Sequence, residues 1–115
     1  EPIQAINDIP PEIAVPSQML SGPGKHYALE VKGDSMIEEG IFDGDFVVCD
    51  KRDTANNGEI VVALVDGQEA TLKRIYWHEP GKVMLCPANS EMSPMEFQSD
   101  RVVVQGILRC QLRQY

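Results

Sequence analysis

Turn-forming pairs divide this chain into strand-length segments, and this punctuation restricts the fold more than any other feature. Asp66-Gly67 is a strong hairpin signal, because both residue types tolerate positive φ. Asn57-Gly58 marks another turn, and Pro80-Gly81 suits the two central positions of a type II turn. Between such turns, the predicted strands cover residues 26–32, 46–49, 59–65, 69–77, 82–86 and 101–112, the last with a bend or bulge at Gly106.

Helical structure is expected in a single turn, over residues 35–39, with Gly40 as its C-terminal cap. At least six short strands with close turns predict an all-β fold of small, highly twisted sheets or a partly closed barrel of short antiparallel strands. A length of 115 residues suits one domain. We expect that domain to cover residues 25–115. Residues 1–24 are predicted to form an extended arm, because prolines interrupt them at Pro2, Pro10, Pro11, Pro16 and Pro23.

The charge balance argues against nucleic-acid binding by these residues. A net charge of −8 repels phosphate, so any contact with DNA would have to come from a segment outside this sequence. No apolar run approaches the roughly 20 residues that a membrane helix needs. The opening residues 1–4 lack the basic and apolar regions of a signal peptide. We therefore expect no membrane partner.

The cysteines and histidines do not form a metal-binding pattern. Cys49, Cys86 and Cys110 are odd in number, widely spaced and placed in apolar, strand-like segments. They predict buried free thiols in a reducing cytoplasm, and not a zinc site. His26 and His78 are too few and too badly placed for a metal site or a catalytic triad. We expect no metal and no cofactor.

Ser35 and Lys73 are the candidate catalytic residues. Ser35 follows a predicted strand and begins the predicted helical turn, where successive backbone N–H groups can face an oxyanion. Lys73 lies in a later strand. A neutral lysine amine can serve as the base for a serine nucleophile. The usual pKa of lysine is about 10.4, so it would have to fall by roughly 3, which burial in an apolar site can cause.

Each of these residues also has a purely structural interpretation. Ser35 would cap the helical turn, with Glu38 three residues later completing a capping box. Lys73 would be a solvated lysine on a strand face that it shares with Thr71 and Ile75. The local sequence alone leaves both interpretations open.

Several motifs together resemble one family. Residues 27–36 (YALEVKGDSM), 40–45 (GIFDGD), 58–63 (GEIVVA) and 70–74 (ATLKR) follow one another as in the C-terminal domain of the LexA repressor family. Residues 87–90 (PANS) and 104–106 (VQG) resemble its later landmarks. The resemblance covers residues 26–112 and is specific because the motifs agree in order and spacing. It favours the Ser-Lys dyad over the structural interpretations.

This resemblance implies a bacterial, cytoplasmic transcriptional repressor of the DNA-damage (SOS) response, with a fold like that of signal peptidases. In the family, an N-terminal winged helix-turn-helix domain binds operator DNA and the C-terminal domain forms a homodimer. The activated RecA filament stimulates the protein to cleave its own Ala-Gly bond between the two domains. By resemblance, Ser35 is the nucleophile and Lys73 its base, and the backbone N–H groups of Asp34 and Ser35 are candidates for the oxyanion hole.

The resemblance also directs the dimer contact to the C-terminal strand, where pairing between copies would cover unpaired backbone groups. The candidate interface residues are Gly106, Ile107, Leu108, Arg109, Cys110, Gln111 and Leu112. The opening pair Glu1-Pro2 is similar to the pair that often follows the scissile glycine. The chain is therefore expected to be a self-cleavage product or its equivalent, with residues 1–24 as the arm behind the cut.

Four other functions are alternatives. A UmuD-like polymerase accessory protein or a phage repressor would share the dyad, and the segment upstream of Glu1 would distinguish them. A type I signal peptidase uses similar chemistry, but this sequence shows no membrane anchor. A non-catalytic dimerisation module would use Ser35 and Lys73 only structurally, and alanine variants of both would distinguish it.

Overall fold

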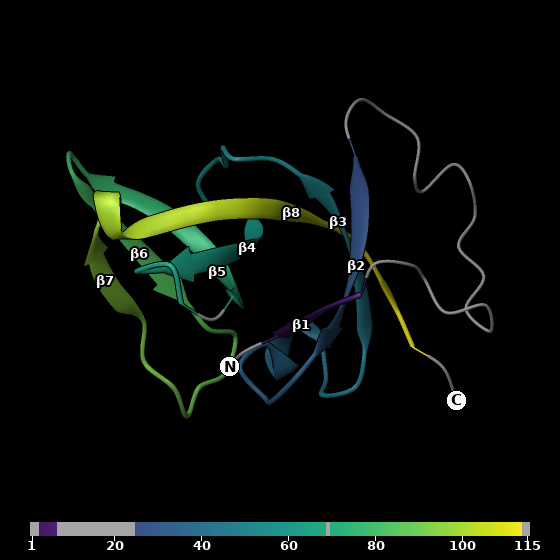
Figure 1. The fold of residues 1–115 in the computed structure, drawn as a ribbon. Helices are drawn as coiled ribbons and strands as arrows, with labels where there is room; N and C mark the ends of the chain where they lie inside the picture. The colour runs from purple at the N-terminus through teal and green to yellow at the C-terminus, as the bar shows by residue number, and fades with distance from the viewer. Residues whose placement is uncertain (1–2, 7–24, 69, 114–115) are drawn as a thin grey trace.

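Eight strands form a single antiparallel sheet (Figure 1). The computed structural model describes residues 3–6, 25–68 and 70–113. The strands are β1 Ile3–Ile6, β2 His26–Val31, β3 Phe46–Lys51, β4 Ile60–Val65, β5 Ala70–Glu79, β6 Lys82–Cys86, β7 Met95–Gln98 and β8 Val102–Leu112. Two 3-10 turns, η2 Ile37–Glu39 and η3 Ser99–Arg101, accompany them. The strand order is β1-β2-β3-β8-β4-β5-β6-β7, so β1 and β7 are the two edges of an open sheet.

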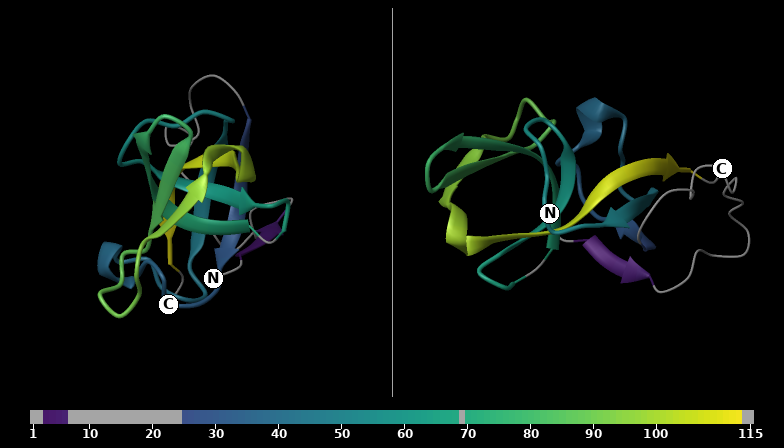
Figure 2. Two further views of the ribbon diagram at one scale, coloured as in Figure 1. Left: turned by 90° about the vertical axis from the view of Figure 1, so that its left-hand side faces the viewer. Right: turned by 90° about the horizontal axis from the view of Figure 1, so that it is seen from above.

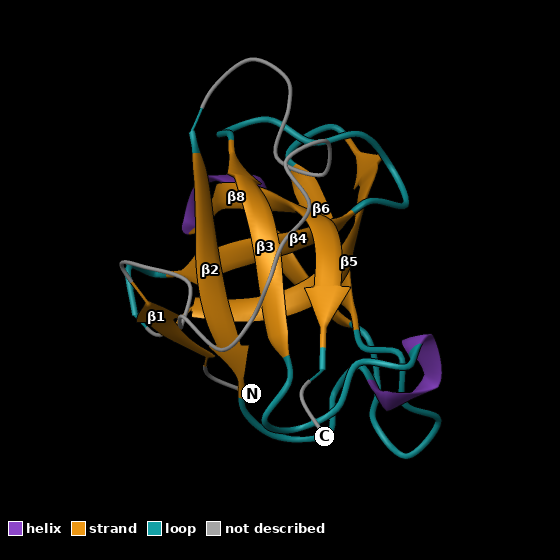
Figure 3. Cartoon of the chain, turned by 90° about the vertical axis from the view of Figure 1, so that its right-hand side faces the viewer, coloured by secondary structure: helices purple, strands orange, loops and turns teal. Residues whose placement is uncertain are grey.

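The long strand β8 joins the two halves of the sheet. Its C-terminal part pairs with β3 and its N-terminal part pairs with β4. Figure 2 shows β8 curving from one half of the molecule to the other, and in Figure 3 β4 and β5 run across behind β2 and β3. Opposite Val62 the partner is Gly106, but opposite Ala63 it is Val104, so the register shifts beside Gly106. The predicted bulge is confirmed.

Two hydrophobic cores share the β4–β5 hairpin. Val61 and Ala63 face one core, whereas Val62 between them faces the other. Because both faces of β4 are covered, its sequence is a continuous apolar run rather than an alternation. The first core contains Leu29, Val31, Met36, Ile41, Val47, Cys49, Val62 and Leu72. The second contains Val61, Ala63, Ile75, Val83, Leu85, Val102, Val104 and Ile107.

The predicted all-β class is confirmed, and each predicted strand segment is present. Asp66 and Gly67 have φ values of 56° and 68°, the left-handed conformation that the hairpin turn requires. Gly40 ends the predicted helical turn with φ 78°. The sequence analysis missed β7, and it did not foresee that Ile3–Ile6 pairs with β2. The rest of the predicted arm, residues 1–2 and 7–24, lies outside the described residues.

All three cysteines are free thiols, as predicted. Cys49 is fully buried, and Cys86 and Cys110 are partly buried. Burial, with smaller contributions from Cys110 and Asp50, raises the pKa of Cys49 to about 12. Helical structure in the described part of the chain is limited to turns, none of them long and apolar enough to cross a membrane.

Candidate active site

The structure brings Ser35 and Lys73 together from distant parts of the sequence. Lys73 Nζ lies 3.1 Å from Ser35 Oγ, within hydrogen-bond distance. Ser35 is buried, with 6% of its surface exposed, and Lys73 is half-buried on β5. The predicted proximity is therefore confirmed. The contact has the separation that proton transfer between a hydroxyl and an amine requires.

Apolar anchors on both sides hold the turn that carries Ser35. Gly33 has φ 86°, which lets the chain leave β2 sharply, and its N–H donates to Asp43 Oδ1 at 2.7 Å. Met36 and Ile41 are almost completely buried in the first core. The N–H of Ile41 also donates to the Met36 carbonyl at 3.2 Å. We call residues 35–41 the nucleophile turn, after the role predicted for Ser35.

The capping interpretation of Ser35 is wrong. Met36 occupies the N-terminal cap position of η2, and no side chain caps this turn. Glu38, the proposed partner in a capping box, instead accepts a hydrogen bond from the Ser90 N–H at 2.7 Å. The Ser35 hydroxyl is thus directed to Lys73 and not to the start of the turn.

A loop after β6 fixes the backbone beside Ser35. The sequence analysis assigned no role at the site to this loop. Asn89, a buried side chain, donates through Nδ2 to the Asp34 carbonyl at 2.9 Å. The Ala88 N–H donates to the Ser35 carbonyl at 2.7 Å. Because C=O and N–H point in opposite directions in a trans peptide, the Asn89 contact also fixes where the Ser35 N–H points. The oxyanion hole at Asp34 and Ser35 stays a prediction.

Lys73 is oriented by uncharged oxygens of its own strand. Its Nζ donates to Thr71 Oγ1 at 2.6 Å and to the Leu72 carbonyl at 3.3 Å. Thr71 can reach the ammonium group because residues two apart on a strand share a face. Neither oxygen is charged, and both contacts direct Nζ towards Ser35.

An apolar hollow adjoins Lys73. It has a volume of about 160 Å³ and is lined by Val65, Thr71, Lys73, Leu85, Pro87, Ser93, Met95 and Phe97. A larger hollow of about 590 Å³, lined by Lys25, Lys51, Arg52, Asp53, Val104 and Gln105, contains neither member of the Ser-Lys pair. The smaller hollow is the better candidate for a substrate site, because it reaches the lysine and offers apolar walls to an extended peptide.

The predicted dimer strand, β8, is central in the sheet over only part of its length. β4 pairs with residues 102–107 of this strand and β3 pairs with residues 106–112, so among the described residues only Gly106 and Ile107 have partner strands on both sides. Backbone pairing between copies through residues 108–112 stays a prediction. Gly106 and Ile107 are buried within the chain. A contact at this strand could also use its outward side chains, among which Gln105 and Arg109 are exposed and Val103 is 53% exposed.

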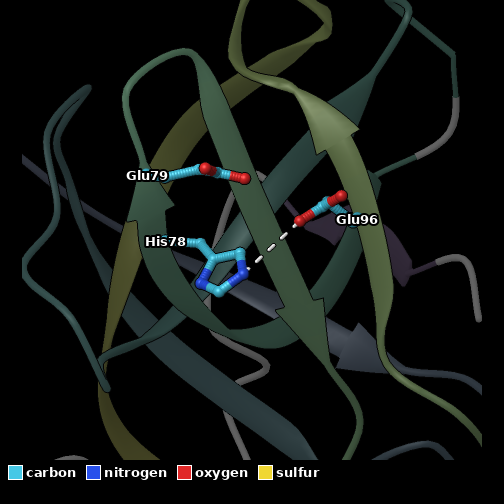
Figure 4. A group of neighbouring side chains, drawn as sticks. All are labelled: His78, Glu79 and Glu96. Atoms are coloured by element: carbon cyan, nitrogen blue, oxygen red, sulfur yellow. Dashed lines mark ion pairs between the residues drawn. The ribbon is translucent and has the colours of Figure 1, made fainter.

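One group of side chains in the described residues has the composition of a metal site, and the sequence analysis did not identify it. His78, Glu79 and Glu96 offer ligand atoms that all lie within 4.8 Å of one another (Figure 4). All three are exposed. Lys82 Nζ lies 3.6 Å from Glu79 and 4.0 Å from Glu96, so its ammonium group already offsets these carboxylates. None of the three residues lines the hollow at Lys73, although Glu96 stands between two residues that do, Met95 and Phe97.

Comparison with known proteins agrees with this geometry. Residues 1–109 match the family described as Peptidase S24-like. The chain therefore belongs to the Peptidase S24-like family, a serine peptidase family.

Three of its relatives are LexA repressors. The chain is 54% identical over 114 residues to the LexA repressor of Cereibacter sphaeroides, covering 99% of this chain and 50% of the relative. It is 51% identical over 114 residues to the LexA repressor of Novosphingobium aromaticivorans, and this match covers 99% of this chain and 47% of the relative. It is 50% identical over 115 residues to the LexA repressor of Gluconacetobacter diazotrophicus, and this match covers 100% of this chain and 45% of the relative. The chain thus spans about half the length of these relatives.

Proposed function

We propose that this chain is the self-cleaving and dimerising part of a LexA-like transcriptional repressor, with Ser35 and Lys73 as its catalytic dyad. The contact of 3.1 Å between Lys73 Nζ and Ser35 Oγ carries this proposal. The half-length match to LexA repressors supports it, because a repressor also needs a DNA-binding part. With a net charge of −8, these residues are unsuited to that task.

The reaction is the cleavage of an Ala-Gly peptide bond. Ser35 Oγ forms a bond to the alanine carbonyl carbon, and its proton passes to the neutral amine of Lys73. The backbone N–H groups of Asp34 and Ser35 stabilise the oxyanion. When the carbon–nitrogen bond breaks, Lys73 returns the proton to the glycine amine. Water then hydrolyses the ester, with Lys73 again as the base, and restores free Ser35.

The apolar hollow couples substrate binding to activation of the base. A peptide segment lying against Leu85, Met95 and Phe97 would displace water from the surroundings of Lys73. Removal of water disfavours the charged ammonium form, so the bound segment itself favours the neutral base. Such coupling explains how the protease remains latent until its own segment is in place.

Cleavage rate should rise with pH, because only the neutral amine accepts the serine proton. Below the pKa of Lys73, the rate of cleavage of a peptide with an Ala-Gly bond should increase about tenfold per pH unit. Initial rates from about pH 7 to about pH 10 test this, with circular dichroism at each pH as the folding control. A flat profile over that range is incompatible with lysine as the base.

Cleavage would act as a switch in the whole repressor. A dimer holds two DNA-binding parts on the two half-sites of an operator, and cutting the chain converts linked contacts into independent ones. The activated RecA filament, in the bacterial cytoplasm, is the proposed stimulus. This role requires that these residues dimerise.

The proposed dimer contact runs along β8, through the backbone edge of residues 108–112 and the outward side chains of the strand. Replacing Val103 by glutamate should convert the dimer into a monomer at micromolar concentration, because a desolvated carboxylate opposes association. Sedimentation velocity measures this. Met95→Glu is the matched control, since Met95 is 58% exposed but lies on β7. A Val103→Glu protein that sediments as the unchanged dimer would place the contact elsewhere.

A further inference from the structure

Side chains at the end of β8 bind the buried carboxylate of Asp45, next to the nucleophile turn. Asp45 is only 3% exposed. Arg113 binds it with two donors, Nε to Oδ1 at 2.9 Å and Nη2 to Oδ2 at 3.0 Å. Gln111 Nε2 and the Phe42 N–H each donate to Oδ2 at 2.8 Å. A carboxylate so fully bonded is a rigid attachment point.

The same two side chains also bind the carbonyl of Gly40, near the end of the nucleophile turn. The Gly40 carbonyl accepts from Gln111 Nε2 at 2.6 Å and from Arg113 Nη2 at 2.8 Å. Carbonyls at the end of a helical turn lack partners within the turn, so such contacts determine its position. The Arg113 guanidinium additionally lies 4.8 Å above the Phe42 ring.

These contacts restrain Ser35 through a short, hydrogen-bonded segment. The Gly40 N–H donates to the Ile37 carbonyl at 3.0 Å, and the Ile41 N–H donates to the Met36 carbonyl. A displacement of Gly40 would therefore move the whole turn. Asp43, in the same loop as Asp45, holds the other end through its bond to the Gly33 N–H.

We propose that Arg113 and Gln111 are positioning residues for the nucleophile: they fix the turn that holds Ser35 Oγ in reach of Lys73. This inference rests on the proposed function and adds to it a connection between β8 and the dyad. Misplacement of a reacting group by about 1 Å can reduce a rate by about 100-fold. Loss of these bonds should thus slow the reaction of Ser35 without changing the chemistry of Lys73.

β8 offers a matched control for this test. Arg109 binds another buried aspartate, Asp50, with Nη1 at 3.1 Å from Oδ2. Arg109 lies on β8 and Arg113 directly follows it, and each arginine neutralises a buried carboxylate. Asp50 lies on β3 and pairs with His26, Arg52 and Arg109, all of them outside the nucleophile turn. Comparison of Arg113→Ala with Arg109→Ala separates positioning from general stabilisation of the strand.

The experiment measures the reaction of Ser35 with an alkyl fluorophosphonate, which needs no bound peptide. Ser35 Oγ forms a bond to phosphorus, fluoride leaves, and the hydroxyl proton passes to Lys73. Intact-protein mass spectrometry gives the rate across the pH range, and thermal melts give the folded fraction. We expect Arg113→Ala to lower the plateau rate at least about tenfold, with an unchanged pH midpoint. Arg109→Ala should remain within about twofold of the unsubstituted protein.

Each result decides the inference. Equal rates in Arg113→Ala and the unsubstituted protein overturn the positioning role and leave the proposed dyad intact. An equal slowing in Arg113→Ala and Arg109→Ala has the same consequence. If Arg113→Ala does not fold, Gln111→Ala is judged by the same criterion. No labelling of the folded, unsubstituted protein at Ser35, or equal labelling in Lys73→Ala, contradicts the proposed function itself and with it the inference.

Discussion

A Lys73→Ala variant should lose peptide cleavage by a factor of at least about 10³ while remaining folded. Ser35 then keeps its place on the nucleophile turn but has no base within reach, and a serine hydroxyl at neutral pH is a weak nucleophile. Because the two groups act as a unit, the Ser35→Ala and double variants should show losses of similar size, not their product. Cleavage of a peptide with an Ala-Gly bond, followed by liquid chromatography, measures the effect.

The control for this result is a lysine outside the site. Lys82 on β6 pairs with Glu79 and Glu96 at the surface, so Lys82→Ala removes the same side chain without touching the hollow at Lys73. We expect its cleavage rate to stay within about twofold, as for most surface substitutions. A folded Lys73→Ala protein with more than a tenth of the original rate would exclude Lys73 as the base.

Gly106→Ala should destabilise the fold by about 1–3 kcal/mol, through overpacking. Gly106 needs no special φ; it is required because other atoms approach it closely. A methyl group there would lie 2.9 Å from the Asp50 carbonyl oxygen and directly on the Tyr27 hydroxyl. Asp50 is held in the β3–β8 ladder, opposite Ile107, so it cannot withdraw. Urea denaturation gives the change in the free energy of unfolding.

A second substitution tests the cause of this loss. Among the described residues, the buried Tyr27 hydroxyl has no hydrogen-bond partner, so Tyr27→Phe should cost little. It removes the closest of the three approaching atoms, the hydroxyl oxygen, and Gly106→Ala should therefore be less harmful in the Tyr27→Phe background. Gln105→Ala, an exposed neighbour on β8, serves as the control. An unchanged free energy of unfolding in Gly106→Ala would contradict the packing described here.

Local sequence was sufficient to predict most of the fold. Asp66-Gly67 predicted the β4–β5 hairpin because its turn chemistry is fixed by two neighbouring residues. By contrast, β7 covers only Met95–Gln98, too short a segment for an alternation to be recognised. The pairing of Ile3–Ile6 with β2 is a long-range contact that no local pattern records.

The candidate site was likewise predicted only in part, because some of its contacts are not recorded in the local sequence. The proximity of Ser35 and Lys73 was predicted through family resemblance, since Ser35 alone resembled a helix cap as much as a nucleophile. The central position of β8 was not predicted, because a strand signal does not reveal how many neighbours the strand has. The contacts of Asn89 and Arg113 join residues far apart in the chain, and only the folded structure shows them.

Cleavage of a supplied peptide is the most direct test of the Ser-Lys assignment. The chain would be incubated at about pH 9 with a peptide carrying one Ala-Gly bond, and the products identified by mass spectrometry. The account predicts a single cut between alanine and glycine, with a transient acyl group on Ser35, and no cut by Ser35→Ala. A cut of equal rate by folded Ser35→Ala, or no cut up to about pH 10 by the folded chain at millimolar peptide, would contradict it.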